Sequence, residues 1–208
     1  YGKTNIGKNK KAIVEFVSAN PTGPLTVGHG RGAIIGDVIS RILEWNGYSV
    51  DREYYFNNAG RQMRILGESL KSRYLEISEI KNQFPENGYQ GEYIYDIAKL
   101  FKQEFSDKYI EEQNINIFKN YAENKIFDDI KKTLNNLNIN FKSFFNEDDL
   151  YKNKDIDRII SDLDKKKLIY KKDNATWFAG TKANRPVDRV LIKSSGEPTY
   201  RLPDMAYH

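Results

Sequence analysis

The amino-acid sequence predicts an α/β fold in which helices cover a parallel sheet of the doubly wound kind. An apolar run at 12–17 is followed by a loop and then by apolar residues at helical spacing. The same order of strand and helix repeats at 49–56 and 63–77. Such alternation is typical of parallel strands joined by crossover helices. The chain has 208 residues, enough to bury a core, and no cysteine that could form a disulfide.

The first strand is predicted from apolar and β-branched residues at 12–17, the length of a strand buried in a parallel sheet. Glu15 interrupts this run, and a charge in the middle of an apolar strand is costly unless a cation pairs with it. The loop at 18–24 contains two prolines and a glycine, which exclude regular structure. A helix ending at Asn46-Gly47 follows, predicted from six apolar residues: Ile34, Ile35, Val38, Ile39, Ile42 and Leu43.

The pattern changes after residue 82. Apolar residues at helical spacing recur at 94–105 and 118–137 with no strand between them. We therefore expect a first part of the α/β fold at 1–82, a helical insertion at 83–145, and a return to the fold at 146–208. Residues 139–145 are a candidate strand. The last segment predicts a helix at 156–163 that ends in a basic run at 165–172, antiparallel strands at 176–178 and 189–193, and a turn at 195–198.

The composition limits the classes of function. Lysine and arginine total 33 against 29 acidic residues, and the net charge of +4 fits either a solvated surface or a nucleic-acid partner. Two histidines and no cysteine exclude a three-histidine metal site and a thiolate nucleophile, so no metal site is expected. No apolar run of about 18 residues is present, so we expect no membrane segment and a cytoplasmic location. The residues at both ends indicate a piece of a larger protein.

One tetrapeptide, Thr26-Val27-Gly28-His29, lies where the first loop enters the first helix. The start of a helix offers unpaired N–H groups and a partial positive charge to a phosphate. Gly28 leaves the backbone open to a nucleotide, and His29 can donate a hydrogen bond where charge builds up on a transferring phosphate. The pattern therefore indicates a nucleotide site, although a histidine in an ordinary helix cap would give the same four residues.

The longer string around this tetrapeptide resembles one family. The segment from Glu15 to Ala33, with Gly36-Asp37 and Glu53-Tyr54-Tyr55 after it, resembles the signature region of bacterial-type arginyl-tRNA synthetases, which are class I aminoacyl-tRNA synthetases. The tetrapeptide corresponds to their HIGH motif. The blocks 88–94, 188–200 and 203–208 resemble the family in the same order. Two positions depart from the usual residues, namely Thr26 in place of histidine and Asn58 in place of aspartate.

The resemblance implies a Rossmann-like (HUP-type) catalytic domain, of which this chain is the N-terminal half with an insertion. It implies that arginine reacts with ATP, accompanied by Mg²⁺, and is transferred to tRNA(Arg), with tRNA needed before activation. The whole enzyme is expected to be a monomer. The second half of the nucleotide fold, with its KMSKS-type loop, and the anticodon-binding domain are not in this sequence, so we expect no aminoacylation by the chain alone.

The resemblance also assigns residues. Thr26 and His29 are the implied catalytic residues, and the implied ATP-binding residues are Pro21, Thr22, Gly23, Thr26, Gly28 and His29. The implied arginine-binding residues are Glu15, Ser18, Asn20, Tyr200 and Asp204. A guanidinium is a planar fork of donors, so carboxylates such as Glu15 and Asp204 are the groups expected to select it.

Three alternatives remain at this stage. A nucleotidyltransferase of the same superfamily would share the strand, the loop and a Thr-x-Gly-His motif. A non-catalytic tRNA-binding module would keep the fold without the chemistry. Asp204 would also serve as a plain helix cap after Pro203.

Overall fold

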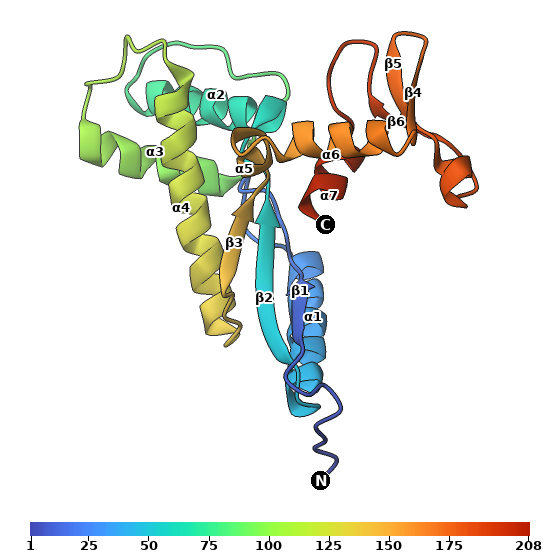
Figure 1. Ribbon diagram of the computed structural model, residues 1–208. Coiled ribbons are helices and arrows are strands. Elements are labelled where there is room, and N and C mark those ends of the chain that lie inside the picture. Colours follow the sequence, from blue (N-terminus) through green and yellow to red (C-terminus); the bar gives the residue numbers. More distant parts are fainter. The chain divides into compact units, whose positions relative to one another are not determined.

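The computed structural model describes residues 1–208 and divides into two compact units, Tyr1–Phe145 and Asn146–His208 (Figure 1). Each unit has its own three-stranded sheet and its own apolar core. The predicted site residues at 15–29 lie in the first unit, whereas Tyr200 and Asp204 lie in the second. Each unit is therefore described separately.

The sheet of the first unit has the order β1 (Lys11–Glu15), β2 (Ser49–Phe56), β3 (Ser143–Asn146). β1 and β2 are parallel, with Glu15 opposite Glu53. On the other side of β2, Lys142 pairs with Asp51 and the ring of Phe145 stacks on Tyr55. These contacts advance in the same direction along both strands, so β3 is parallel to β2 as well. The predicted α/β class with a parallel sheet is confirmed.

Helix α1 (Val27–Trp45) connects β1 to β2 and lies alongside β1 (Figure 1). The predicted helix is confirmed, but its apolar stripe is not the buried face. The buried residues of α1 are small or polar: Ala33, Gly36, Asp37 and Ser40. The stripe is 45–56% exposed at Ile34, Ile35, Val38, Ile39 and Ile42. The helix therefore approaches the strands through short side chains, and its apolar face points away from this core.

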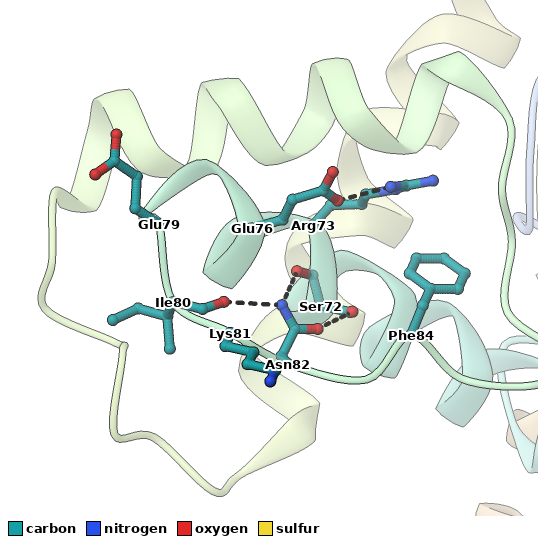
Figure 2. A pocket seen from close by; sticks show the side chains of 8 residues that line it. All are labelled: Ser72, Arg73, Glu76, Glu79, Ile80, Lys81, Asn82 and Phe84. Carbon is teal, nitrogen blue, oxygen red and sulfur yellow. Dashed lines mark hydrogen bonds and ion pairs between the residues drawn. The ribbon is translucent and has the colours of Figure 1, made fainter.

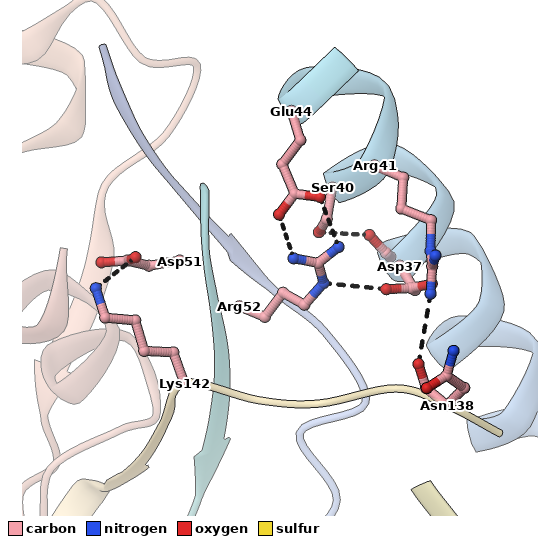
Figure 3. A network of polar contacts seen from close by, with 9 residues as sticks. Asp37, Ser40, Arg41, Glu44, Asp51, Arg52, Asn138 and Lys142 are labelled. Atoms are coloured by element: carbon pink, nitrogen blue, oxygen red, sulfur yellow. Dashed lines mark hydrogen bonds and ion pairs between the residues drawn. The ribbon is translucent and has the colours of Figure 1, made fainter. Parts of the chain in front are cut away.

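A polar network joins α1 to β2 (Figure 3). Arg52 on β2 donates from Nε to Asp37 at 3.0 Å and from its two terminal nitrogens to Glu44 at 2.5 and 3.1 Å. Arg41 Nε donates to the other oxygen of Asp37 at 2.5 Å. Asp37 is only 8% exposed, and the two guanidinium groups supply the pairing that a buried carboxylate requires. The hydrogen bond to Glu44 raises the pKa of Arg52.

Three further helices, α2 (Gly60–Ile77), α3 (Glu92–Phe105) and α4 (Ile115–Asn136), complete the first unit. They match the helical patterns predicted at 63–77, 94–105 and 118–137. Their shared core is aromatic. The ring centroid of Phe118 lies 5.1 Å from that of Phe101 and 6.0 Å from that of Tyr74, and all three side chains are fully buried. The helices pack on the same core as the sheet, which fixes the strands that carry the candidate site.

The second unit contains an antiparallel sheet in the order β4–β5–β6 and short helices around it. Its elements are α5 (Glu147–Lys152), α6 (Asp155–Lys165), β4 (Ile169–Lys172), β5 (Ala175–Phe178), the 3-10 turn η1 (Gly180–Ala183), β6 (Arg189–Ile192) and α7 (Arg201–Tyr207). The predicted antiparallel strands are confirmed. The prediction that the basic run at 165–172 forms the end of a helix is partly wrong, because Ile169–Lys172 is a strand that pairs with β5. Leu163, Leu191 and Leu202 form the core.

Candidate active site

The loop between β1 and α1 begins with a tight turn. β1 ends at Glu15 rather than at Val17, because Ser18 N–H donates to Phe16 O at 3.0 Å and closes a three-residue turn over Val17. Val17 has a φ of 67° and Ser18 a φ of 46°, both in the left-handed region. For a β-branched residue this conformation costs on the order of 1–3 kcal/mol. Strain of this kind concentrates at functional sites, so it marks the loop as a candidate site.

Glu15 and Ser18 pair across this turn. Ser18 Oγ donates a short hydrogen bond to Glu15 Oε1 and accepts one from Tyr55 N–H at 3.2 Å, so it links the end of β1 to β2. Glu15 is the last residue of β1 and is exposed, which corrects the expectation of a charge in the middle of a buried strand. Its carboxylate makes no ion pair within the chain. A free carboxylate at the carboxyl end of a parallel strand is well placed to bind a cationic ligand.

Tyr54 on β2 holds the next residue of the loop. Its hydroxyl donates to Ala19 O at 2.8 Å and accepts from Ala19 N–H at 3.1 Å, and the residue is completely buried. Burial raises the pKa of Tyr54 to about 12, so the hydroxyl keeps its proton at neutral pH. Sequence reasoning did not assign Tyr54 a role. Its only signal was its place in the block that resembles the family.

Asn20 is fixed by contacts to the end of β2 and the start of α2. Its Oδ1 accepts from Asn57 N–H at 2.9 Å, and its Nδ2 donates to Gln62 Oε1 at 3.4 Å. An amide nitrogen carries two donors, so one N–H of Asn20 stays available. Because Asn20 is exposed, this donor can reach a carboxylate of a ligand. The turn therefore presents an acceptor at Glu15 and a donor at Asn20.

Thr26 and His29 form a reciprocal cap at the start of α1. Thr26 is the N-cap residue, and its backbone N–H donates to His29 Nδ1 at 3.0 Å. The Thr26 hydroxyl lies 3.2 Å from the same nitrogen. Since Nδ1 accepts a hydrogen bond, the proton of the neutral ring is on Nε2. His29 thus offers an Nε2–H donor beside the unpaired N–H groups of the helix start.

The glycine and proline positions leave this helix start accessible. A Cβ at Gly28 would meet only Thr26 Oγ1, at 3.6 Å, so packing does not require glycine there. Pro21 is buried and anchors the loop, and Thr22 N–H donates to Asn20 O at 2.7 Å. The structure thus brings the predicted nucleotide residues together in one loop and one helical turn.

The two remaining predicted residues lie in the second unit, on the first turn of α7. Tyr200 is the N-cap residue and is 68% exposed, and Asp204 is exposed one turn later. Residues four apart lie on the same helical face, so the two side chains are neighbours. The alternative of Asp204 as the N-cap is wrong, because the helix begins at Arg201.

A cavity of about 350 Å³ lies elsewhere in the first unit, beside the end of α2 (Figure 2). It is lined by Ser72, Arg73, Glu76, Glu79, Ile80, Lys81, Asn82 and Phe84. None of the predicted site residues lines it. The structure contains no group of three acidic, histidine or cysteine side chains that could hold a metal ion. It also has no helix with the length and apolar character needed to cross a bilayer.

Comparison with known proteins decides the family. The family model for class I tRNA synthetases of the arginine type, catalytic domain, matches residues 1–208. The chain belongs to the class I arginyl-tRNA synthetase family. A curated relative from Desulfotalea psychrophila, named arginine–tRNA ligase, is 54% identical over the whole chain, and one of the same name from Chlorobium limicola is 52% identical. The chain spans 38% and 39% of the length of these two relatives.

Solved structures of arginyl-tRNA synthetases share the fold. The structure from Campylobacter jejuni has a TM-score of 0.89 and 35% identity, and the match covers 99% of this chain and 46% of that one. The Thermus thermophilus enzyme has a TM-score of 0.67 and 20% identity, over 95% of this chain and 35% of its own. The predicted class I synthetase fold is thereby confirmed.

The two departures from the usual arginyl-tRNA synthetase residues each have a local partner. Thr26 keeps the helix cap, since threonine is a favoured N-cap residue. Asn58 donates from Nδ2 to Glu123 Oε1 on α4 at 2.7 Å. An aspartate at position 58 would place two carboxylates at this contact, so the amide suits the glutamate in this member of the family.

Proposed function

We propose that this chain forms the N-terminal part of the catalytic domain of an arginine–tRNA ligase. In the first step an oxygen of the arginine carboxylate attacks the α-phosphorus of ATP. The bond from that phosphorus to the leaving oxygen breaks, and arginyl-adenylate and pyrophosphate form. In the second step a hydroxyl of the terminal ribose of tRNA(Arg) attacks the arginyl carbonyl, and AMP leaves. The family match and the 54% identical relative of that name support this proposal.

The single observation that carries the proposal is the loop between β1 and α1. It joins Glu15, a carboxylate without an ion pair, to a helix start with unpaired N–H groups and the Nε2–H of His29. Two substrates of opposite charge, a guanidinium and a polyphosphate, need these two kinds of group close together in one segment. The chemistry of the loop therefore fits both substrates of the first step.

On the nucleotide side, catalysis is positioning and charge stabilisation. The α1 start attracts the phosphates through its N–H groups and its partial positive charge. His29 donates to the oxygen on which charge builds up during the attack, and the Thr26 hydroxyl is a second donor. Pro21, Thr22, Gly23 and Gly28 form the surface that the nucleotide approaches. Mg²⁺ accompanies the ATP and offsets the charge of its phosphates.

On the arginine side, carboxylates select the guanidinium. Glu15 and Asp204 accept its hydrogen bonds, and Tyr200 offers a ring and a hydroxyl. Ser18 orients the Glu15 carboxylate through its short hydrogen bond. The free amide N–H of Asn20 binds the arginine carboxylate and holds it for attack. Lysine carries only one compact charge, whereas a guanidinium can form two parallel hydrogen bonds with a carboxylate, so carboxylate recognition favours arginine over lysine.

The remaining parts of the proposal concern the whole enzyme. Its third substrate is tRNA(Arg), and it acts as a monomer in the cytoplasm, where translation uses its product. The family match supports the first of these, because the matching model is that of the tRNA synthetases. The charge of +4 is small, so tRNA binding is expected to depend on placed lysine and arginine residues rather than on net charge.

The test is an arginine-dependent exchange of pyrophosphate into ATP by the full-length protein, with and without tRNA, followed by aminoacylation. Glu15→Gln and Asp204→Asn should each raise the KM for arginine by at least about tenfold, because each leaves donors of the guanidinium unpaired. Asp51→Asn is the matched control, since Asp51 is an acidic residue of β2 that pairs with Lys142. Equal effects of Glu15→Gln and Asp51→Asn would refute the assignment. Exchange without arginine would favour a nucleotidyltransferase.

A further inference from the structure

The block at 88–94 has no role in the site described so far, yet it is held firmly against α2. Gly88 N–H donates to Pro85 O at 2.9 Å and forms a turn. Tyr89 N–H donates at 2.9 Å to the hydroxyl of Ser69, which is completely buried on α2. A segment fixed by a buried hydrogen bond is a rigid support for the residues that follow it. The next helix, α3, begins at Glu92 on this support.

Tyr93, in the first turn of α3, reaches back to the loop between β1 and α1. Its hydroxyl donates to Thr22 O at 2.7 Å, across a separation of 71 residues. Its ring lies against Gly23, where an added Cβ would be 3.2 Å from the hydroxyl oxygen and 3.3 Å from Cζ. Burial raises the pKa of Tyr93 to about 12, so the hydroxyl remains a donor at neutral pH. The contact therefore fixes one peptide group of the nucleotide loop.

Gly91 makes room for this ring. A Cβ at Gly91 would lie 2.6 Å from Tyr93 Cε1 and 2.7 Å from Cδ1, closer than any side chain allows. The backbone at Gly91 has a φ of −59°, which any residue adopts. Glycine is therefore required here by the position of the tyrosine ring and not by the backbone.

The hydrogen bond to Thr22 sets the direction of the Gly23 N–H. In a planar trans peptide the C=O and the N–H point in opposite directions, and the chain has no cis peptide bond. With Thr22 C=O turned to Tyr93, the N–H of Gly23 points away from that hydroxyl. It makes no hydrogen bond within the chain. Gly23 precedes Pro24, which has no N–H of its own, so the Gly23 N–H has no neighbouring donor at the next position of the loop.

We propose that Tyr93 is a positioning residue for ATP, which orients the Thr22–Gly23 peptide so that the Gly23 N–H is presented to the phosphates. This inference rests on the proposed function, because it takes the loop to be the nucleotide site. Tyr93 does not touch the substrate itself. It keeps a peptide group from rotating, and a preset donor loses less entropy on binding than a mobile one.

The experiment replaces Tyr93 by phenylalanine in the full-length enzyme, which removes only the hydroxyl. In arginine-dependent pyrophosphate exchange with tRNA present, the KM for ATP should rise about tenfold, while kcat and the KM for arginine change by less than about twofold. Tyr74→Phe is the matched control. Its hydroxyl donates to Ser106 O at the same 2.7 Å, but in the helical core away from the loop. It should lower the melting temperature to a similar extent and leave the KM for ATP unchanged.

A second variant, Gly91→Ala, keeps the Tyr93 hydroxyl but displaces its ring. It should reproduce the change in KM for ATP. Direct titration of ATP, by calorimetry on the wild type and Tyr93→Phe, separates the two proposals. If the wild type fails to activate arginine yet Tyr93→Phe binds ATP about tenfold more weakly, the function is wrong and the positioning role stands. If Tyr93→Phe and Tyr74→Phe give the same KM for ATP, the positioning role is overturned whatever the function.

Discussion

Replacing Gly28 by alanine separates a role in nucleotide binding from a role in folding. An added Cβ would meet only Thr26 Oγ1 at 3.6 Å, which is an ordinary contact, and Gly28 is not among the glycines with positive φ. Alanine is favoured over glycine in helices by up to about 1 kcal/mol. We therefore expect the free energy of unfolding to stay the same or to rise by up to about 1 kcal/mol, which urea unfolding measures.

The activity should change in the opposite direction. A methyl group on the face that the nucleotide approaches displaces the phosphates by about 1 Å, and a misplacement of that size costs up to about a hundredfold in rate. We expect kcat/KM for ATP, from pyrophosphate exchange by the full-length protein, to fall by at least about tenfold. Gly32→Ala, one turn further along α1, is the control, because a Cβ there meets nothing within 4 Å. An unchanged kcat/KM for Gly28→Ala, with stability preserved, would refute the reasoning.

Three further predictions concern other parts of the chain. Tyr54→Phe removes a hydrogen bond that holds the part of the loop assigned to arginine. It should therefore raise the KM for arginine about tenfold and change the KM for ATP little; equal changes in the two KM values would contradict this. Arg52→Met leaves the buried Asp37 with one guanidinium fewer and should lower the free energy of unfolding by about 2 kcal/mol. An unchanged urea midpoint would show that the network does not stabilise the fold. Hydrogen bonds from Thr181, its N–H first, hold the pKa of Asp188 below its ordinary 3.8. The stability that the Asp188 carboxylate gives is therefore complete above about pH 5 and is lost as the pH falls through the lowered pKa. In Asp188→Asn the melting temperature should fall less between pH 5 and acid pH than in the wild type. The same fall in both proteins would contradict a stabilising role of these hydrogen bonds.

The order of elements was predictable because its signals are local. β2 spans Ser49–Phe56 as predicted, since the turn residues Asn46-Gly47 and Asn57-Asn58 bound this segment on its two sides. The end of β1 was not predictable. Val17 is β-branched and favours a strand. The turn that overrides this preference is closed by Ser18 N–H and Phe16 O and is tied to β2 by the hydrogen bond from Tyr55 N–H to Ser18 Oγ, 37 residues later. A tertiary contact of this kind leaves no periodic trace in the sequence.

Burial was predicted less well than secondary structure. The apolar stripe of α1 correctly indicated a helix, because spacing reports the period of the backbone. It did not indicate which face lies on these three strands. The structure buries Ala33 and Ser40 instead, so the helix approaches the sheet through its small residues. The spacing of apolar residues identifies an apolar face of a helix, but it does not identify the surface against which that face packs.

The candidate site was predicted in part for the same reason. Residues 15–29 lie together because they are neighbours in the chain, so a motif can find them. Tyr54 and Tyr93 act through hydrogen bonds to backbone atoms of the loop. Such contacts use no distinctive chemistry, and any buried tyrosine would look alike in a sequence. Only their position in blocks shared with the family singled them out.

The hydroxyl contacts that hold the loop also set when the loop can become ordered during synthesis. The hydrogen bond to Thr22 can form only after Tyr93 has been synthesised, 71 residues later, and the hydrogen bonds to Ala19 can form only after Tyr54, 35 residues later. A ribosome adds about 5–20 residues per second, so the earlier strands and α1 emerge seconds before this support exists. Contacts between such distant residues also form slowly, because a long loop must first close. The loop between β1 and α1 therefore becomes rigid later than its own place in the sequence suggests, only after the start of α3 has been made.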